Sequence, residues 1–476
     1  MLKEGYAVWQ CANHEISLTR PRIMGVLNVT PDSFSDGGEH LATDAAVARA
    51  LEMLDEGADI IDVGGESTRP GFTPVSQNEE AERVVPVIRK ILAAVPNAII
   101  SIDTRHPEVA KICARLGASI INDVTGFTNP AMVEVAAAST CGCIITHWDR
   151  TLEEKPPRKQ VTLDDAKPSR AVPSSQRFTL PEEAPIMRKV MGFLGDSART
   201  LMRAGIAKER LCIDPGPGFD KDTDQDVVIQ RATRSMVSMG YPLMCAVSRK
   251  RFVGALSGEK NAAERDAATI GVALSSIAAG AQIVRVHNVA ATAQALNSYW
   301  AVNRKDPRQG FISIGSNVGD RLDNLARAVS LINHIPLTCV VQVSHAYDTA
   351  PAYGISSPVA NAVVEIRTEL HPIVLLEELF KVEDTLGRTR TPGEDGHGDR
   401  TIDCDLCWIE GESHAGTKLS LPHPRMGERD FVILPMEDLM HDPKRFFEYA
   451  NAPVTVAPRE KRVGMVMNDL GELSWE

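Results

Sequence analysis

The sequence lacks a hydrophobic stretch long enough to cross a membrane. It has no uninterrupted run of about 18 apolar residues, the minimum for a membrane-spanning helix. The opening segment MLKEGYAVWQCANHE also lacks the basic start and apolar centre of a signal peptide. We therefore expect a cytoplasmic protein with no membrane partner.

A cysteine framework and an excess of positive charge are missing as well. The nine cysteines are odd in number and scattered over 476 residues, unlike those of a disulfide-rich secreted protein, so we expect reduced thiols. The net charge of −12 offers no uniform basic surface, and we expect no nucleic-acid partner. An anionic substrate would have to be held by local lysine and arginine clusters or by a metal ion.

What the sequence does contain is a repeated alternation of strand-like and helix-like segments. Eight short β-branched runs are each followed by a helix-like stretch, and they occupy residues 23–30, 58–65, 97–104, 118–125, 141–148, 210–218, 242–250 and 281–288. Eight βα units are the number that closes a (β/α)₈ (TIM) barrel, a fold of the α/β class. A doubly wound open sheet is the alternative.

The eight runs end in polar residues. Those residues are Asn28, Asp62, Asp103, Asn122, His147, Asp214, Lys250, and Arg285 with His287. Each one alone could be a cap or a turn former, but barrel active sites lie at the carboxyl ends of the strands. Eight polar ends on one rim therefore predict a site. The charged, Pro- and Ser-rich segment 149–186 reads as a surface insertion without chemistry.

A second pattern follows a linker at residues 301–310. Strand-like and helix-like segments then succeed one another in the order β, α, β, β, α, β, which is typical of a ferredoxin-like α+β sandwich. We therefore expect two domains, a barrel over residues 20–300 and a smaller α+β domain over residues 311–476.

Within the second domain, RTIDCDLCW (residues 400–408) could be a thiolate metal site, a carboxylate metal site or a strand without chemistry. In a strand, alternate residues face opposite sides, which puts Ile402, Cys404, Leu406 and Trp408 in the core and Asp403, Asp405 and Cys407 on the other face. The two cysteines could then not bind one zinc ion. We expect Cys404 to be a buried free thiol.

The motifs of the first half carry a family resemblance. In order, IMGVLNVTPDSFSDGG, DVGGESTRPG, SIDT, IIND, DPGPGF, SRKRF and RVHN closely resemble dihydropteroate synthase over about residues 20–298. That family consists of (β/α)₈ barrels that join p-aminobenzoate to a dihydropterin methyl diphosphate and release pyrophosphate. Other pterin-binding barrels, such as corrinoid-linked methyltransferases, share the architecture, but the TPDSFSDGG and ESTRP loops favour the synthase.

The resemblance implies roles for individual residues. The diphosphate would be bound through Mg²⁺ on Asn28 and by Thr68, Arg69, Arg285 and His287, and the pterin by Asp103, Asn122, Asp214 and Lys250. The aminobenzoate pocket would be formed by Phe34, Pro70 and Phe219, with Arg249 near the carboxylate. Direct catalytic roles are expected for Asp103, Lys250, Arg285 and His287. Trp148 and Arg251 depart from common family patterns on the pterin and aminobenzoate sides.

The second half resembles another family. GFISIGSNVGDRLDNL, YDTAP, NAVVEI, GRTR, DRTIDCDL and LPHPRMGERDFVILP are similar to 6-hydroxymethyl-7,8-dihydropterin pyrophosphokinase over about residues 309–445. That enzyme transfers a diphosphate from ATP to the pterin alcohol, and its product is the substrate of the synthase. The chain therefore resembles a bifunctional enzyme of folate biosynthesis, and the likeness to synthases implies a homodimer formed through the barrel.

This second resemblance also implies residue roles. Asp403 and Asp405 would bind Mg²⁺ on ATP, and the nucleotide and its phosphates would be bound by Arg388, Arg390, Arg400, His423 and Arg429. Asn361 would bond the pterin edge and Phe431 would stack on its ring. Three positions, Val359, His397 and Asp399, depart from the family pattern, and Asp399 would weaken nucleotide binding if it pointed inward.

Two alternatives to the bifunctional reading follow. In one, only the synthase is active and the second domain is a weakened enzyme or a scaffolding module. In the other, the chain is a pterin-binding or regulatory protein without turnover.

Overall fold

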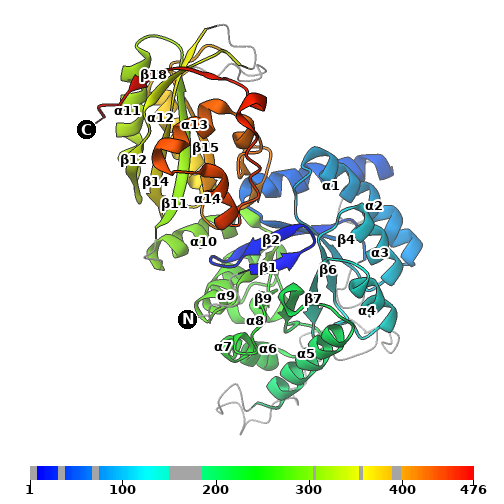
Figure 1. Cartoon of the computed structure of the whole chain (residues 1–476). Coiled ribbons are helices and arrows are strands. Elements are labelled where there is room, and N and C mark those ends of the chain that lie inside the picture. The colour runs from blue at the N-terminus through cyan, green and yellow to red at the C-terminus, as the bar shows by residue number, and fades with distance from the viewer. Residues whose placement is uncertain are drawn as a thin grey trace. The chain divides into compact units, whose positions relative to one another are not determined.

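The computed structural model describes residues 8–30, 38–66, 74–148, 184–303, 307–352, 357–388 and 398–475. The chain forms two compact units (Figure 1). One comprises Met1–Leu296 with Ala415–Thr417, and the other comprises Asn297–His414 with Lys418–Glu476. The insertion expected at 149–186 lies outside the described residues as far as residue 183.

The first unit contains the eight expected parallel strands. They are β3 (Arg22–Asn28), β4 (Ile60–Gly64), β5 (Ile100–Asp103), β6 (Ile120–Asp123), β7 (Gly142–Thr146), β8 (Leu211–Asp214), β9 (Met244–Cys245) and β10 (Ile283–Val286). They pair in the order β8-β7-β6-β5-β4-β3-β10-β9, and a parallel bridge between Ile213 and Leu243 joins the two ends. The prediction of a (β/α)₈ barrel is thereby confirmed, and the alternative of a doubly wound open sheet is wrong.

Helices follow the strands, as the alternating pattern predicted. They are α1 (Gly38–Glu56), α2 (Gln77–Ala94), α3 (Pro107–Leu116), α4 (Pro130–Ala137), α5 (Pro185–Arg203), α6 (Thr223–Arg231), α7 (Thr233–Val237), α8 (Arg251–Ser257), α9 (Asp266–Ala278) and α10 (Val289–Asn303). Local sequence sets several of their starts. Asp222 forms a capping box with Gln225 at α6, because each side chain accepts a backbone N–H of the other residue.

A hairpin before the first barrel strand packs into the barrel interior. It consists of β1 (Val8–Cys11) and β2 (His14–Ser17), and its Trp9 and Ile16 share a core cluster with residues that begin barrel strands, such as Ile120. Trp9 Nε1 donates to the carbonyl of Arg210 at 3.0 Å. The hairpin precedes residue 20, yet its apolar side chains close the amino-terminal end of the barrel.

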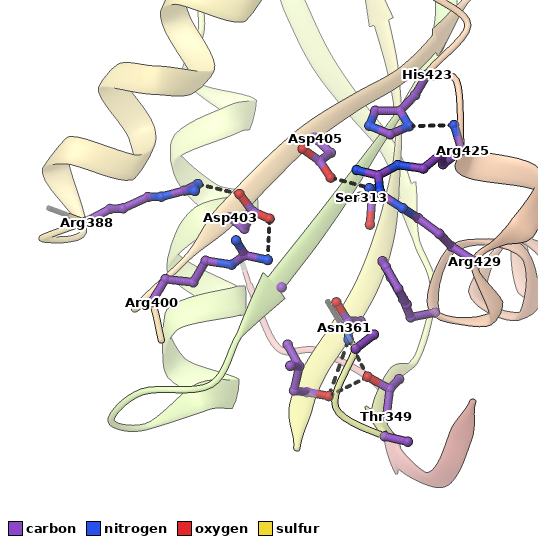
Figure 2. A pocket seen from close by; sticks show the side chains of 15 residues that line it. Ser313, Thr349, Asn361, Arg388, Arg400, Asp403, Asp405, His423, Arg425 and Arg429 are labelled. Atoms are coloured by element: carbon purple, nitrogen blue, oxygen red, sulfur yellow. Dashed lines mark hydrogen bonds and ion pairs between the residues drawn. The ribbon is translucent and has the colours of Figure 1, made fainter. Parts of the chain in front are cut away.

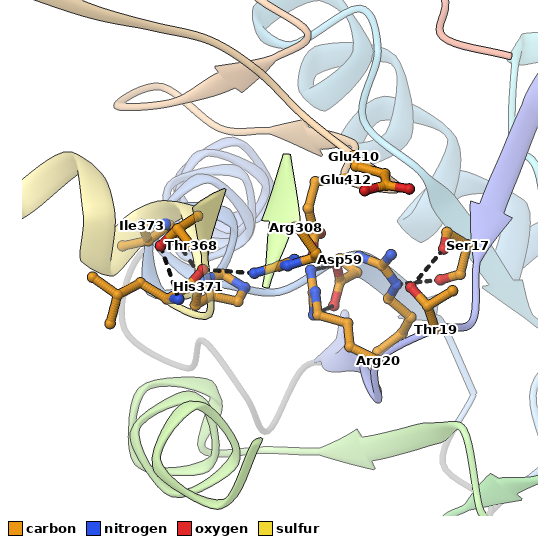
Figure 3. A network of polar contacts seen from close by, with 12 residues as sticks. Ser17, Thr19, Arg20, Asp59, Arg308, Thr368, His371, Ile373, Glu410 and Glu412 are labelled. Carbon is orange, nitrogen blue, oxygen red and sulfur yellow. Dashed lines mark hydrogen bonds and ion pairs between the residues drawn. The ribbon is translucent and has the colours of Figure 1, made fainter. Parts of the chain in front are cut away.

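A buried ion-pair cluster ties the segment after the hairpin to the barrel. Arg20 Nη2 lies 2.5 Å from Asp59 Oδ1 (Figure 3). Arg22 Nη1 lies 3.0 Å from the same oxygen, and the Ile23 amide donates to Asp59 Oδ2 at 2.8 Å. Burial acts to raise the pKa of Asp59, but the two guanidinium groups outweigh it and lower the pKa below its ordinary value. Asp59 therefore remains charged between the two arginines.

The second unit is a six-stranded sheet with helices on both faces. Its larger elements are β11 (Arg308–Ser316), α11 (Arg321–Asn333), β12 (Thr338–Val343), β13 (Ala346–Thr349), β14 (Val359–Thr368), α12 (Pro372–Thr385), β15 (Asp403–Ile409), α13 (Asp430–Leu439), α14 (Pro443–Tyr449) and β18 (Val466–Gly471). A small hairpin, β16 (His414–Ala415) with β17 (Ser420–Leu421), follows β15. One face packs on α11 and α12, and the other packs on α13 and α14.

The sheet differs from the expected pattern at its edge. The segment predicted as one strand, CVVQVSHAYDT, forms β12 and β13, which both pair with β14. They are separated at Ser344, whose hydroxyl accepts the Val363 amide in place of a backbone carbonyl. In addition, β18 from the end of the chain pairs with β13, a strand more than one hundred residues earlier, and no local pattern predicted this pairing.

The strand RTIDCDLCW alternates as expected only in its first part. Ile402, Cys404 and Leu406 lie in the core cluster beneath α11 and α12, whereas Cys407 lies in the opposite cluster. The placement of Trp408 on the Cys404 face is wrong, because Trp408 packs beside Cys407. The cause is a β-bulge: Phe311 pairs with Trp408 and Ile312 with Leu406, so Cys407 is the extra residue.

Candidate active sites

In the barrel, a charged network joins four strands at their carboxyl ends. Arg285 on β10 donates through Nε to Asp62 Oδ2 at 2.6 Å and through Nη2 to Asp103 Oδ2 at 2.7 Å. Asn122 on β6 donates through Nδ2 to Asp62 Oδ2 at 3.2 Å. Three of the predicted residues, Asp103, Asn122 and Arg285, are therefore linked through Asp62, a strand-end residue to which the sequence assigned no role.

Burial shifts the acidity of this network. Desolvation raises the pKa of Asp103 to about 7, although the Arg285 guanidinium acts in the opposite direction. Burial acts to lower the pKa of Arg285, but the Asp62 and Asp103 carboxylates raise it above its ordinary value. The arginine therefore remains a fixed positive charge at the rim.

A second group of predicted residues lies next to the barrel seam, where β8 meets β9. Asp214 ends β8, and its Oδ1 accepts the Gly216 amide at 2.8 Å. Lys250 Nζ lies 4.7 Å from the centre of the Phe219 ring and donates to the Pro217 carbonyl. Burial lowers the pKa of Lys250 and raises that of Asp214, which disfavours the charged form of each side chain.

The remaining barrel predictions fall at different places. His287 Nδ1 lies 2.9 Å from Ser248 Oγ, and Asn28 ends β3 in a half-buried position. Arg249 is joined to Asp266 by two hydrogen bonds, Nε to Oδ1 at 2.7 Å and Nη2 to Oδ2 at 2.8 Å, so one edge of its guanidinium is already bound to a carboxylate. Thr68, Arg69, Phe34 and Pro70 lie outside the described residues.

The second unit has a cavity of about 220 Å³ on one face of its sheet (Figure 2). Among its lining residues are Asn361, Arg388, Arg400, Asp403, Asp405, His423, Arg429 and Phe431, all predicted from the sequence. Arg390 lies outside the described residues, as does His397. The structure therefore brings the described predictions for this domain into one pocket.

The strand register explains how the floor of this cavity forms. Gly315 on β11 pairs with Asp403 on β15 and with Asn361 on β14, and Ser313, two residues earlier, pairs with Asp405. Positions two apart share a face, so the carboxylates and the amide point to one side. A Cβ on Gly315 would lie 2.6 Å from Asn361 Oδ1, which leaves room only for glycine there.

Arginines surround the two carboxylates (Figure 2). Asp403 is bonded to Arg388 through Oδ1 and to Arg400 through Oδ2, the latter at 3.0 Å, and Asp405 Oδ2 accepts from Arg429 Nη1 at 2.9 Å. Burial, followed by the charge of Asp405, raises the pKa of Asp403 against the effect of the arginines. Alternating carboxylates and guanidinium groups can bind a polyphosphate together with its cation.

The donor set fits Mg²⁺. Asp403 and Asp405 provide hard oxygen atoms, and among the described residues there is no group of three or more His, Cys, Asp or Glu side chains that could hold a metal ion. Mg²⁺ usually takes one or two carboxylates from the protein and the rest of its octahedron from water and phosphate oxygens. A soft-ligand metal site shared by Cys404 and Cys407 does not fit, because the two side chains pack in core clusters on opposite faces of the sheet.

His423 and Asn361 both line the cavity, and their surroundings differ. Burial, with help from Arg429 and Arg425, lowers the pKa of His423 to about 4, so its imidazole is neutral near pH 7. Asn361 is 5% exposed and donates through Nδ2 to Thr349 Oγ1 at 2.7 Å. The centre of the Phe431 ring lies 5.4 Å from Arg429 Cζ.

Several supporting residues were missed by the sequence reasoning. Arg425, Thr349 and Ser313 line the cavity. Glu383 on α12 accepts the Cys404 amide at 2.7 Å and Arg388 Nη1 at 2.6 Å, and so orients the strand and the arginine together. Arg425 could have been found from its place in the LPHPRMGERDF motif. Glu383 has no motif of its own, and its contact with the Cys404 amide joins a helix to a strand that begins later in the chain.

Asp399, the unexpected acidic residue, does not line the cavity. Its Oδ1 accepts from Asn317 Nδ2 at 2.6 Å, and Asn317 Oδ1 in turn accepts the Arg400 amide at 2.7 Å. The inward orientation that would weaken nucleotide binding is therefore not adopted. Asp399 and Asn317 instead hold the chain just before Arg400.

In the part of the chain that the structure describes, no helix has the length and apolar character needed to cross a membrane. Comparisons with known families agree with the two sites. Residues 24–287 match the family of pterin binding enzymes, and residues 311–441 match 7,8-dihydro-6-hydroxymethylpterin-pyrophosphokinase.

Individual relatives cover the barrel. A dihydropteroate synthase of Staphylococcus haemolyticus is 39% identical over 274 residues, which are 57% of this chain and 91% of the relative. One from Neisseria meningitidis serogroup B is 39% identical over 302 residues, 62% of this chain and 97% of the relative. The solved structure of Xanthomonas albilineans dihydropteroate synthase with 4-aminobenzoic acid is 36% identical with a TM-score of 0.54, over 63% of this chain and 99% of that chain.

Proposed function

Since the chain belongs to the pterin-binding enzyme family and carries a pyrophosphokinase domain, we infer that it is a bifunctional enzyme of folate biosynthesis. Its second unit transfers a diphosphate from ATP to 6-hydroxymethyl-7,8-dihydropterin. Its barrel condenses the resulting diphosphate with p-aminobenzoate to give 7,8-dihydropteroate and pyrophosphate. The observation that carries this proposal is the presence in one chain of two sites whose reactions are consecutive.

In the barrel reaction the methylene C–O bond of the pterin diphosphate breaks, and the amine of p-aminobenzoate forms the new C–N bond and loses a proton. Arg285, fixed by Asp62 and Asp103, holds positive charge where pyrophosphate departs, together with His287. Asn122, Asp214 and Lys250 bind the pterin edge, whose alternating donors and acceptors match buried amide, carboxylate and ammonium groups. The Asp103 carboxylate, when ionised, stabilises positive charge that develops on the pterin.

In the second unit the pterin hydroxyl attacks the β-phosphorus of ATP, and AMP leaves. Arg388, Arg400 and Arg429 bind and orient the phosphates, because each already points at the carboxylate pair. Asn361 and Phe431 position the pterin, and the neutral His423 reaches the nucleotide. Catalysis then consists mainly of positioning and of charge neutralisation around the transferred group.

Mg²⁺ would be held by Asp403 and Asp405 in this pocket and by Asn28 in the barrel, where it would neutralise charge on phosphate oxygens. We also propose that the protein works in the cytoplasm as a homodimer formed through the barrel. The dimer rests on the resemblance to synthases, and sedimentation of the purified chain tests it.

One paired assay tests the proposed function. The purified chain is incubated with hydroxymethyl-dihydropterin, ATP, Mg²⁺ and p-aminobenzoate, and separately with preformed pterin diphosphate, Mg²⁺ and p-aminobenzoate without ATP. Dihydropteroate in both reactions is the expected result. Product only in the second reaction would reduce the second unit to a scaffolding module, and product in neither would support a binding protein without turnover.

A further inference from the structure

A side-chain hydrogen bond joins the ends of two neighbouring barrel strands near the seam. Trp148, two residues after β7, donates through Nε1 to Asp220 Oδ2 at 2.7 Å and is only 5% exposed. Asp220 lies in the loop after β8 and has a φ of 51°, in the left-handed region. The acceptor of the hydrogen bond is therefore a residue in a backbone conformation that is energetically unfavourable for most residue types.

Phe219, immediately before Asp220, contacts both sides of this arrangement. Its ring centre lies 5.0 Å from that of Trp148, with the planes tilted by 31°, and 4.7 Å from Lys250 Nζ. A ring flanked by an indole and an ammonium group has few alternative directions. The direction of Phe219 therefore depends on where the Asp220 turn holds it.

Lys221 holds the same loop through hydrogen bonds to backbone carbonyls. Lys221 Nζ donates to the carbonyls of Gly216 at 2.7 Å, Phe219 at 3.0 Å and His147 at 3.3 Å. The loop is thus attached to the end of β7 twice, by Lys221 through backbone and by Trp148 through its side chain. The Trp148 contact is made to Asp220, the residue that follows Phe219.

We propose that Trp148 and Asp220 are positioning residues of the barrel site. Their hydrogen bond holds the left-handed turn that directs the Phe219 ring, which lines the p-aminobenzoate pocket beside Lys250. This inference rests on the proposed synthase function. It implies that the bond governs productive binding of the aromatic amine, while bond breaking at the pterin proceeds normally once both substrates are bound.

Three substitutions separate the bond from other properties of these residues. Asp220→Gly removes the acceptor and keeps the positive φ without steric cost. Trp148→Phe keeps an aromatic ring and removes the N–H. Asp220→Asn keeps an oxygen acceptor and a residue type that tolerates the left-handed conformation. A role of the hydrogen bond thus predicts the same effect from the first two and little effect from the third.

The measurement is steady-state synthase activity with preformed pterin diphosphate. We expect Asp220→Gly and Trp148→Phe each to raise the KM for p-aminobenzoate about fivefold to tenfold, with kcat within about twofold of the unaltered chain. Asp220→Asn should stay within about twofold in both. The double variant should be no worse than either single one, because both remove the same interaction.

A matched control removes another barrel carboxylate. Asp196 lies on the exposed side of α5 and pairs with Arg199, so Asp196→Asn should leave KM and kcat unchanged. Thermal unfolding of each variant establishes that it is folded. Normal KM in both Asp220→Gly and Trp148→Phe would overturn the positioning role, as would an equal rise in Asp220→Asn. An unaltered chain that makes no dihydropteroate would instead overturn the proposed function itself.

Discussion

The roles proposed for Asp403 and Asp405 in the second reaction depend on strand geometry and on arginine pairing, which act on the same two side chains. The period of two points both carboxylates into the cavity, and Arg388, Arg400 and Arg429 hold them there. Cys404, which stands between the two aspartates, faces the opposite side, where it packs in the core. Neighbouring residues of one strand thus face either the cavity, as Asp403 and Asp405 do, or the hydrophobic core, as Cys404 does.

This division gives a prediction at the residue scale. Asp403→Asn or Asp405→Asn should lower ATP-dependent pterin activation by about 100-fold or more, because a carboxylate that holds Mg²⁺ is lost. The barrel reaction with preformed pterin diphosphate should be unchanged. Cys404→Ala is the control and should cost about 1 kcal/mol of stability with normal turnover. Retained ATP-dependent activity in both aspartate variants would remove the carboxylates from the mechanism.

His423 gives a second residue-scale prediction, on proton uptake. Its pKa of about 4 results from burial and from Arg429 and Arg425, opposed by Asp403. A bound polyphosphate offsets those cations and raises this pKa toward the ordinary value. Near pH 5 the free imidazole is mostly neutral and the bound one more protonated, so ATP binding should take up a fraction of a proton.

Calorimetry in two buffers of different ionisation enthalpy measures that uptake. The observed binding enthalpy should differ between the buffers at pH 5, and His423→Gln should reduce the difference. If His423→Gln leaves the dependence on the buffer unchanged, His423 does not titrate with nucleotide binding.

At the scale of elements, close approach between strands shapes the part of the cavity for which we propose pterin binding. Gly315 pairs with both Asn361 and Asp403, and any Cβ at this position would meet the Asn361 amide oxygen. Asn361 is held by Thr349 Oγ1 and by the Val359 carbonyl, so it cannot move without breaking these bonds. The glycine is thus part of the pocket although it contributes no side chain.

Gly315→Ala should therefore raise the KM for hydroxymethyl-dihydropterin about tenfold, roughly the value of one good hydrogen bond to a buried group. The KM for ATP should change less, because the arginines lie elsewhere in the pocket. Pyrophosphokinase kinetics measure both values. Gly192→Ala, where a Cβ meets no atom within 4 Å, serves as the control. A normal pterin KM in Gly315→Ala would show that Asn361 does not bind the pterin.

The elements also show what sequence patterns can and cannot predict. The eight barrel strands were predictable because each β-branched run ends in a polar residue, and even β9, with only two residues, was located. The division of β12 from β13 depends on one Ser344 hydroxyl bond across the sheet, and the bulge at Cys407 depends on the partner strand. Such features belong to pairs of distant segments, which a single local pattern does not contain.

The same reasoning applies to the sites. Asp403 and Asp405 were accessible because their spacing and motif are local. Asp62 and Glu383 were not assigned roles, although each orients predicted site residues through contacts. Arg285 and Asp62 are separated by 223 positions in the sequence, so their ion pair appears only when the barrel closes.

At the scale of the whole molecule, each unit has its own hydrophobic core, and each contains a buried ion pair. In the barrel, Asp59 is 9% exposed and joined to Arg20 and Arg22. In the second unit, Arg308 and Glu412 form a buried ion pair. Removing one partner of a buried ion pair should therefore destabilise the unit that contains that pair.

Asp59→Asn tests this independence. Removing one partner of a buried ion pair costs about 3–5 kcal/mol, so the barrel should unfold at lower temperature and lose synthase activity at moderate heat. The pyrophosphokinase reaction should persist. Differential scanning calorimetry and the two activity assays follow the units separately, and an equal loss of both activities would contradict independent cores.

The sign of the pH dependence follows from the lowered pKa of Asp59. The stabilisation is fully present above the ordinary carboxyl pKa of about 4 and is lost as the pH falls through the lower folded value. The difference in barrel stability between the unaltered chain and Asp59→Asn should therefore be constant near neutral pH and shrink in acid.

The seam of the barrel has a consequence for ligand binding. Among the described residues, a single parallel bridge, Ile213–Leu243, joins β8 to β9. Asp214 is the residue after Ile213, and Lys250 follows β9 in the chain. A pterin hydrogen-bonded to both side chains would connect β8 to β9 across the least extensively paired position of the barrel. By linkage, such a ligand suppresses opening of the seam. Hydrogen–deuterium exchange at the Ile213 amide should slow when pterin diphosphate is present.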